Sequence, residues 1–177
     1  YKDVLDQLSS FKLPTLILRG NSYTNTNGWN KFSSKLFKKY PDVFYKRTGK
    51  VKLKGQTFVL FDMIWEPWLY RTKITISKNF FHRDTSYSKS RIAKFNDLMK
   101  ENKDCILVSH APPCGYLDKV PKKGSVGSKE VLKIVNKYKP KLVLCGHIHE
   151  GKGRAKIGNT LVINAGARGQ YDIIDIK

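Results

Sequence analysis

Long apolar runs are missing from this sequence. No run approaches the roughly 20 residues that a helix needs to cross a bilayer, and no signal-peptide pattern opens the chain as given. We therefore expect a protein without a membrane partner. The chain also starts directly on an amphipathic pattern at Tyr1, so we expect it to be an internal fragment of a longer protein.

Cysteine is scarce, with Cys105, Cys114 and Cys145 as the complete set. The odd number argues against a disulfide framework, and no Cys-x-x-Cys pair indicates a common structural zinc site. Cys105 and Cys145 flank or lie in predicted buried strands, which favours reduced thiols and a cytoplasmic location. A structural zinc site built from Cys114 and the histidines is the alternative.

Acidic side chains are few, with 14 Asp plus Glu against 34 Lys plus Arg and a formal net charge of +20. A field of this sign attracts polyanions, so RNA or a ribonucleoprotein is a candidate partner. The alternative is that the lysines form ordinary solvated surface, balanced by acidic residues elsewhere in a longer protein. Charge alone says nothing about sequence specificity.

The 177 residues fit one domain, and we expect a single domain over 1–177. Residues 65–87 mix aromatic and cationic side chains. We interpret this stretch as an insertion that packs its aromatics on the core; the alternative is a surface that stacks bases and holds phosphates.

Hydrophobic periodicity predicts an α/β fold. Strand 105–108, helix 129–138 and strand 141–145 form a crossover unit, which predicts that the two strands are parallel. Ser88 is the expected N-cap of a helix that runs to about 102. The other predicted elements are helices at 2–11 and 28–39 and strands at 13–18, 51–54, 57–63, 155–158, 161–164 and 171–176.

Polar residues follow three predicted buried strands: Asn21 the first, His110 the second, and His147 with His149 the third. Ligands collect beyond the carboxyl ends of parallel strands, so we expect one common site. On an extended segment His147 and His149 would point to the same side and grip a metal ion. Gly146 would let an ion or phosphate approach the main chain. The alternative is histidines that bind nothing.

Four motifs, taken in order, resemble the calcineurin-like metallophosphoesterase family, and the likeness is greatest to its small prokaryotic phosphodiesterase-type members. The resemblance spans nearly the whole chain. The motifs are Gly20-Asn21, Ser109-His110-Ala111-Pro112-Pro113, Gly146-His147-Ile148-His149 and Asn164-Ala165-Gly166.

The resemblance implies a two-sheet sandwich flanked by helices (αββα), here N-terminally incomplete and lacking its first strands. It also implies two divalent metal ions, Mn, Fe, Zn or Ni, which hydrolyse a phosphodiester or phosphomonoester. By the same resemblance, Asn21, His110 and His147 would bind one ion and His149 the other.

The chain departs from the family at its acidic motifs. Family members begin with Asp-x-His and then Gly-Asp-x-x-Asp, and this chain has neither, although ten aspartates are present. Neutral ligands alone would leave two dications to repel one another. The family histidine after Gly-Asn is Ser22 here, so no catalytic residue is assigned, and Gly20, Ser22 and Gly146 are candidate substrate contacts. Related sequences often have histidine where this chain has Ser125.

Three functions are consistent with these observations. The first is a phosphoesterase, active only if the missing Asp and His motifs exist upstream, acting on a phosphorylated small molecule or nucleic acid. The second is a degenerate, non-catalytic basic member that binds RNA or a ribonucleoprotein and holds no metal. The third is a mononuclear or structural metal site made by the histidines alone.

Overall fold

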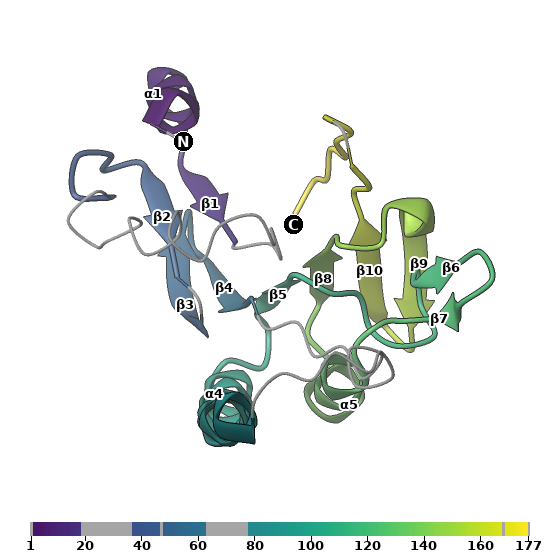
Figure 1. Cartoon of the computed structure of the whole chain (residues 1–177). Coiled ribbons are helices and arrows are strands. Elements are labelled where there is room, and N and C mark those ends of the chain that lie inside the picture. The colour runs from purple at the N-terminus through teal and green to yellow at the C-terminus, as the bar shows by residue number, and fades with distance from the viewer. Residues whose placement is uncertain (1, 19–36, 47, 63–77, 168, 177) are drawn as a thin grey trace.

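The computed structural model of the chain describes residues 2–18, 37–46, 48–62, 78–167 and 169–176 (Figure 1). At its centre is a six-stranded mixed sheet with the order β3-β4-β5-β8-β10-β9. The four inner strands are parallel, and both edge strands are antiparallel to their neighbours. The strands are β3 (Thr48–Leu53), β4 (Gln56–Phe61), β5 (Ile106–Ser109), β8 (Leu142–Cys145), β9 (Gly153–Ile157) and β10 (Thr160–Asn164).

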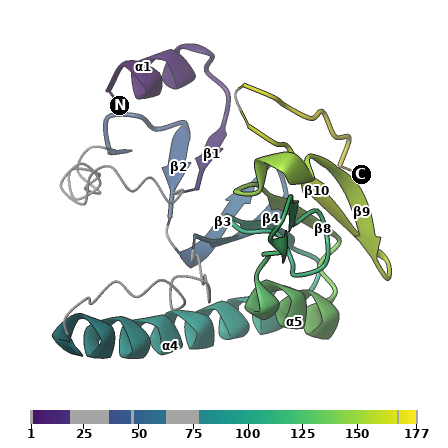
Figure 2. The same ribbon diagram turned by 45° about the vertical axis from the view of Figure 1, so that its right-hand side comes forward.

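Two helices, α4 (Lys78–Glu101) and α5 (Lys129–Tyr138), cover one face of this sheet (Figure 2). Alternate strand residues point toward them, as the two-residue repeat of a strand requires. Phe61 of β4 stacks on Phe95 of α4 with ring centroids 4.0 Å apart. The buried core between sheet and helices also contains Val59, Met99, Cys105, Leu107, Val131, Ile134, Val135, Val143, Ile157 and Val162.

The opposite face of the sheet carries a second apolar cluster. Ile106, Leu142 and Ile163 form its buried centre, and Ile174 and Ile176 of the C-terminal segment pack against it. A separate unit consists of helix α1 (Lys2–Ser10) and the parallel pair β1 (Thr15–Ile17) and β2 (Val43–Tyr45). A two-stranded hairpin, β6 (Lys119–Val120) and β7 (Gly124–Ser125), contacts the short 3₁₀ helix η2 (His149–Gly151).

The α/β class and the crossover unit are confirmed, with β5 and β8 paired in parallel and helix 129–138 in place. The expected helix cap at Ser88 is wrong, because α4 already begins at Lys78. The expected strand 171–176 is also wrong. Both neighbours of β10 are occupied, by β8 and β9, so this segment lies over the face of the sheet instead of joining it.

The described residues do not show the expected two-sheet sandwich; they form one large mixed sheet and two small two-stranded ones. The first predicted strand pairs in parallel with β2, which was not predicted. Most of the predicted helix 28–39 and residues 65–77 of the expected insertion lie outside the described residues; residues 78–87 are the first part of α4. In the described ranges no helix combines the length and apolar character needed to span a membrane.

Helix α5 offers a direct test of local stability. The hydroxyl oxygen of Ser128, its N-cap, accepts a hydrogen bond from the Val131 N–H at 3.1 Å. Ser128→Ala should therefore lower the free energy of unfolding by about 1 kcal/mol, because a helix N–H loses its acceptor. Urea denaturation measures the change. Ser128→Thr keeps the hydroxyl and serves as the matched control; an equal loss in both variants would contradict the capping role.

Candidate metal and phosphate site

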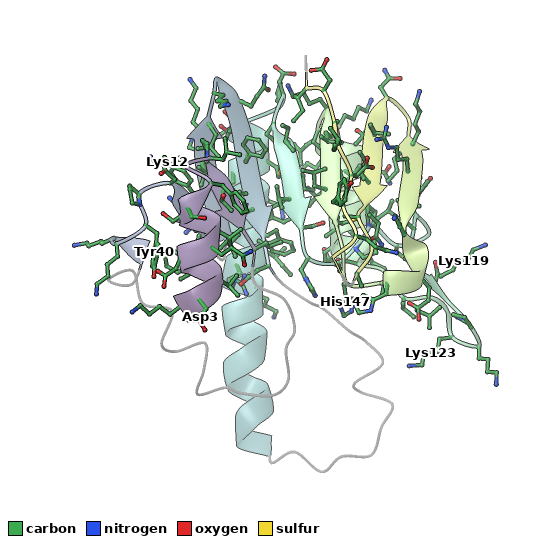
Figure 3. All side chains as sticks on the ribbon, turned by 90° about the horizontal axis from the view of Figure 1, so that it is seen from above. Asp3, Lys12, Tyr40, Lys119, Lys123 and His147 are labelled. Atoms are coloured by element: carbon green, nitrogen blue, oxygen red, sulfur yellow. The ribbon has the colours of Figure 1, made fainter. Side chains whose placement is uncertain are left out.

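Two histidines meet at the carboxyl edge of the sheet. His110 follows β5 and His147 lies just after β8, and because these strands are parallel neighbours, their ends fall together. Nε2 of His110 lies 3.1 Å from Nδ1 of His147, and the rings are tilted by 56°. Figure 3 shows His147 at this edge. The expected convergence is confirmed for these two side chains.

The backbone at His147 has an unusual conformation. Its φ of 69° lies in the left-handed region, and the Ile148 N–H donates to the Gly146 carbonyl at 2.8 Å, which closes a γ-turn around His147. Such a turn is strained for a residue with a side chain, and strain of this kind gathers at functional sites. The turn directs the His147 ring toward His110.

The extended arrangement expected for His147 and His149 is wrong. The chain leaves the strand at Cys145, turns sharply at His147, and enters the short 3₁₀ helix η2 (His149–Gly151). The alternation of side chains along a strand therefore does not apply. His147 pairs with His110, and His149 is exposed to solvent.

Burial, as the largest cause, and electrostatic repulsion from the His147 and His149 rings together lower the pKa of His110 to about 4. His110 is consequently neutral at pH 7. A neutral imidazole nitrogen is the form that binds a metal ion. In the metal-free protein one ring nitrogen of the pair must carry the proton that the other accepts.

The histidine pair fits one metal ion. With metal–nitrogen bonds of about 2.0–2.1 Å, two imidazoles on the same ion have nitrogens about 3.0–3.4 Å apart, and the observed separation is 3.1 Å. Across the part of the chain that the structure describes, no group of three or more His, Cys, Asp or Glu side chains is arranged to hold an ion. The described residues thus bring two candidate imidazole ligands together but not the carboxylates of a dinuclear centre.

Asn164, at the end of β10, is hydrogen-bonded to the loop 146–149, which carries His147 and His149 and which we call the histidine loop. Its amide nitrogen donates to the carbonyls of Ile148 at 2.8 Å and Leu117 at 3.2 Å, and its Oδ1 accepts from the Gly166 N–H at 3.0 Å. The side chain is only 1% exposed. Asn164 was part of a motif without an assigned role; the structure shows that it fixes the peptide between His147 and His149.

Gly146 joins the two histidine loops, because its N–H donates to the His110 carbonyl at 3.1 Å. A Cβ added at this position would meet no atom within 4 Å. There is accordingly open space beside the main chain, as the candidate role in phosphate contact requires. The other candidate contacts, Gly20 and Ser22, and the candidate ligand Asn21 lie outside the described residues.

The structure contains two buried carboxylates to which no sequence motif points. Asp62 follows β4 at the same edge of the sheet and forms an ion pair with Arg91 of α4, which compensates its charge. Asp118 accepts hydrogen bonds within its own loop, including one from Ser125 at 2.7 Å. Ser125, at the position where related sequences often have histidine, is therefore a structural partner of Asp118. Their spacings along the chain gave no signal of either contact.

The depressed pKa of His110 predicts a pH dependence of stability. Its ordinary pKa is 6.5 and its pKa in the folded protein is about 4, so between these values the unfolded chain binds more protons. In chelator-treated protein the free energy of unfolding should fall as the pH drops from 6.5 to 4, by on the order of 1–3 kcal/mol from this group. Urea titrations across this range measure it.

In the same experiment, His110→Asn should remove this contribution, while Asn136→Ala on the exposed side of α5 should keep it. A wild-type curve that coincides in shape with that of His110→Asn would show that His110 protonates normally in the folded state.

Asn164 supplies a second prediction at this site. Asn164→Ala leaves the carbonyls of Ile148 and Leu117 without their donor and should lower the free energy of unfolding by about 1–3 kcal/mol. The exposed Asn136→Ala should change it by less than about 0.5 kcal/mol. Chemical denaturation gives both values, and equal stabilities for the two variants would refute the supporting role of Asn164.

Comparisons with known proteins agree with this geometry. A family model described as "Metallophosphoesterase, calcineurin superfamily" matches residues 84–177. Human Metallophosphoesterase domain-containing protein 1 is 35% identical over 123 residues, which cover 68% of this chain and 34% of that protein. An uncharacterized protein of Methanocaldococcus jannaschii is 35% identical over 107 residues, covering 57% of this chain and 49% of that protein.

The chain thus spans about a third to a half of the length of these relatives, which include human as well as archaeal proteins. A solved crystal structure superimposes with a TM-score of 0.64 and 19% identity, covering 93% of this chain and 62% of that chain, so the fold is shared. The order of the motifs, the histidine pair at the sheet edge and these similarities lead to one conclusion: the chain belongs to the calcineurin superfamily of metallophosphoesterases.

Proposed function

We propose that the protein hydrolyses phosphoesters at a dinuclear metal centre, of the kind typical of its family. The observation that carries the proposal is the His110–His147 pair, whose 3.1 Å nitrogen separation suits two ligands of one ion at the carboxyl edge of the sheet. The proposal requires carboxylate ligands that this sequence lacks at the two acidic family motifs. The activity therefore belongs to a polypeptide that also provides those ligands.

When bound, divalent metal ions polarise the phosphoryl group and neutralise the charge that develops on its oxygens. The residues of this chain would hold the metal ion, position the loop that carries His147 and leave space for the phosphate. His110 presents a neutral imidazole and His147 a second ring nitrogen beside it, and Asn164 keeps the loop that bears His147 in place through the Ile148 carbonyl. Gly146 leaves room for a phosphate oxygen next to the main chain.

The proposal is tested with bis-p-nitrophenyl phosphate and p-nitrophenyl phosphate in the presence of Mn, Fe, Zn or Ni, using the complete protein. His110→Asn and His147→Asn should each lower kcat/KM by at least about 100-fold, since each removes a ligand. Asn136→Ala should retain activity. No hydrolysis of either ester by the complete wild-type protein with any of these metals would refute the proposal.

Elemental analysis of the same samples gives a readout that does not depend on turnover. About two ions per wild-type chain support the dinuclear centre, and about one supports a mononuclear site. His110→Asn and His147→Asn should both lower the metal content.

A second function is favoured by specific observations: the net charge of +20 and the missing acidic motifs. A degenerate member without catalytic metals would use its basic surface to bind RNA or a ribonucleoprotein. It predicts RNA binding that weakens steeply with salt, together with no hydrolysis and no bound metal. Hydrolysis by the wild-type protein would exclude it.

A further inference from the structure

The hairpin of β6 and β7 lies close to the histidine edge and is rich in lysine. Lys119, Lys122 and Lys123 are all exposed within residues 119–125. The only acidic side chain next to them in sequence is Asp118, which is 0% exposed and faces inward. We name these residues, 119–125, the lysine hairpin. Its accessible charge is uniformly positive, although Glu150 is exposed on the neighbouring η2 turn.

Asp118 keeps the lysine hairpin in one conformation. Its carboxylate accepts hydrogen bonds from the N–H groups of Gly115 at 2.9 Å and Gly127 at 2.8 Å, and from the Ser125 hydroxyl at 2.7 Å. These bonds tie together the residues before and after the hairpin. Bonds to a buried carboxylate are among the stronger ones in proteins. The hairpin backbone that carries the lysines is therefore already ordered, which reduces the loss of conformational entropy on ligand binding.

The same hairpin is attached to the histidine loop. Asn164 donates to the carbonyl of Leu117, at the base of the hairpin, and to the carbonyl of Ile148, between the two histidines. Gly151 of η2 packs so closely on the Leu117 carbonyl that a Cβ there would collide with it. The Asn164 amide and the packing of Gly151 together hold the base of the lysine hairpin against the loop that bears His147.

The lysines lie outside the immediate surroundings of the histidines. Figure 3 shows Lys119 and Lys123 to one side of His147, at the same edge of the molecule. A small phosphoester held at His147 would leave them unused. A phosphodiester polymer carries further phosphates beyond the one held at the histidines, and their negative charge suits the exposed lysines.

We propose that the lysine hairpin binds backbone phosphates of a single-stranded nucleic acid whose scissile diester lies at the histidine pair. The inference rests on the proposed function and names the substrate class for it. Each lysine contact releases condensed counterions, so binding should depend on salt with a slope of about −0.7 for each contact.

The test compares two variants of equal charge in the complete protein. Lys119→Glu with Lys122→Glu changes the hairpin, whereas Lys100→Glu with Lys103→Glu changes exposed lysines at the C-terminal end of α4, at the opposite end of β5 from His110. Both lower the formal net charge by four. Fluorescence anisotropy with 12-nucleotide RNA and DNA strands, at several salt concentrations, measures affinity. Urea unfolding checks that both variants fold.

The hairpin variant should bind both strands at least about 10-fold more weakly at low salt and with a slope less steep by about 1.4, whereas the α4 variant should stay within about 2-fold of wild type. The kcat/KM of the hairpin variant on bis-p-nitrophenyl phosphate should stay within about 2-fold of wild type, because this small ester does not reach the hairpin. Equal losses in the two variants, or a loss with only one kind of strand, would overturn the assignment to backbone phosphates.

The outcomes separate the two proposals. If wild type hydrolyses the small diester but the two charge variants bind nucleic acid equally well, the hairpin inference fails alone. If wild type hydrolyses neither small ester, the proposed function fails, and the anisotropy data still decide whether the lysine hairpin contacts a strand.

Discussion

The parallel pairing of β5 with β8 is the constraint on which the site depends. These strands carry His110 and His147 beyond their ends, and their register brings the two rings into contact without any local sequence link between them. Helices α4 and α5 pack on one face of the sheet, and the C-terminal segment packs on the apolar cluster of the other, so side-chain packing on both faces holds these strands in place. The packing that stabilises the core therefore also positions the two histidines.

Much of this frame follows from the sequence. The helix 129–138 was predicted within its observed bounds because its cap and its periodicity agree, and the crossover between the two buried strands predicted their parallel pairing. The motif Gly146-His147-Ile148-His149 correctly indicated the loop that carries one member of the histidine pair. The resemblance to the family, based on the order of motifs, is confirmed by the family match over 84–177.

The parts that failed depend on contacts between distant residues. The alternation rule placed His147 and His149 on one side, but the hydrogen bond from Gly146 to the His110 carbonyl and the γ-turn at His147 end the strand early. Periodicity also made 171–176 a strand, although β8 and β9 already flank β10. Neither the burial of Asp118 nor the pairing of Asp62 with Arg91 has a local pattern that reveals it.

At His147 the left-handed backbone favours glycine, whereas the contact with His110 requires an imidazole. Glycine would adopt this conformation without strain, so a residue without a side chain would lower the backbone energy at this position. Yet glycine offers no imidazole to face His110. An unstrained backbone and the contact with the His110 ring therefore favour different residues at this position, and a library selected for thermal resistance alone would tend to lose the histidine pair.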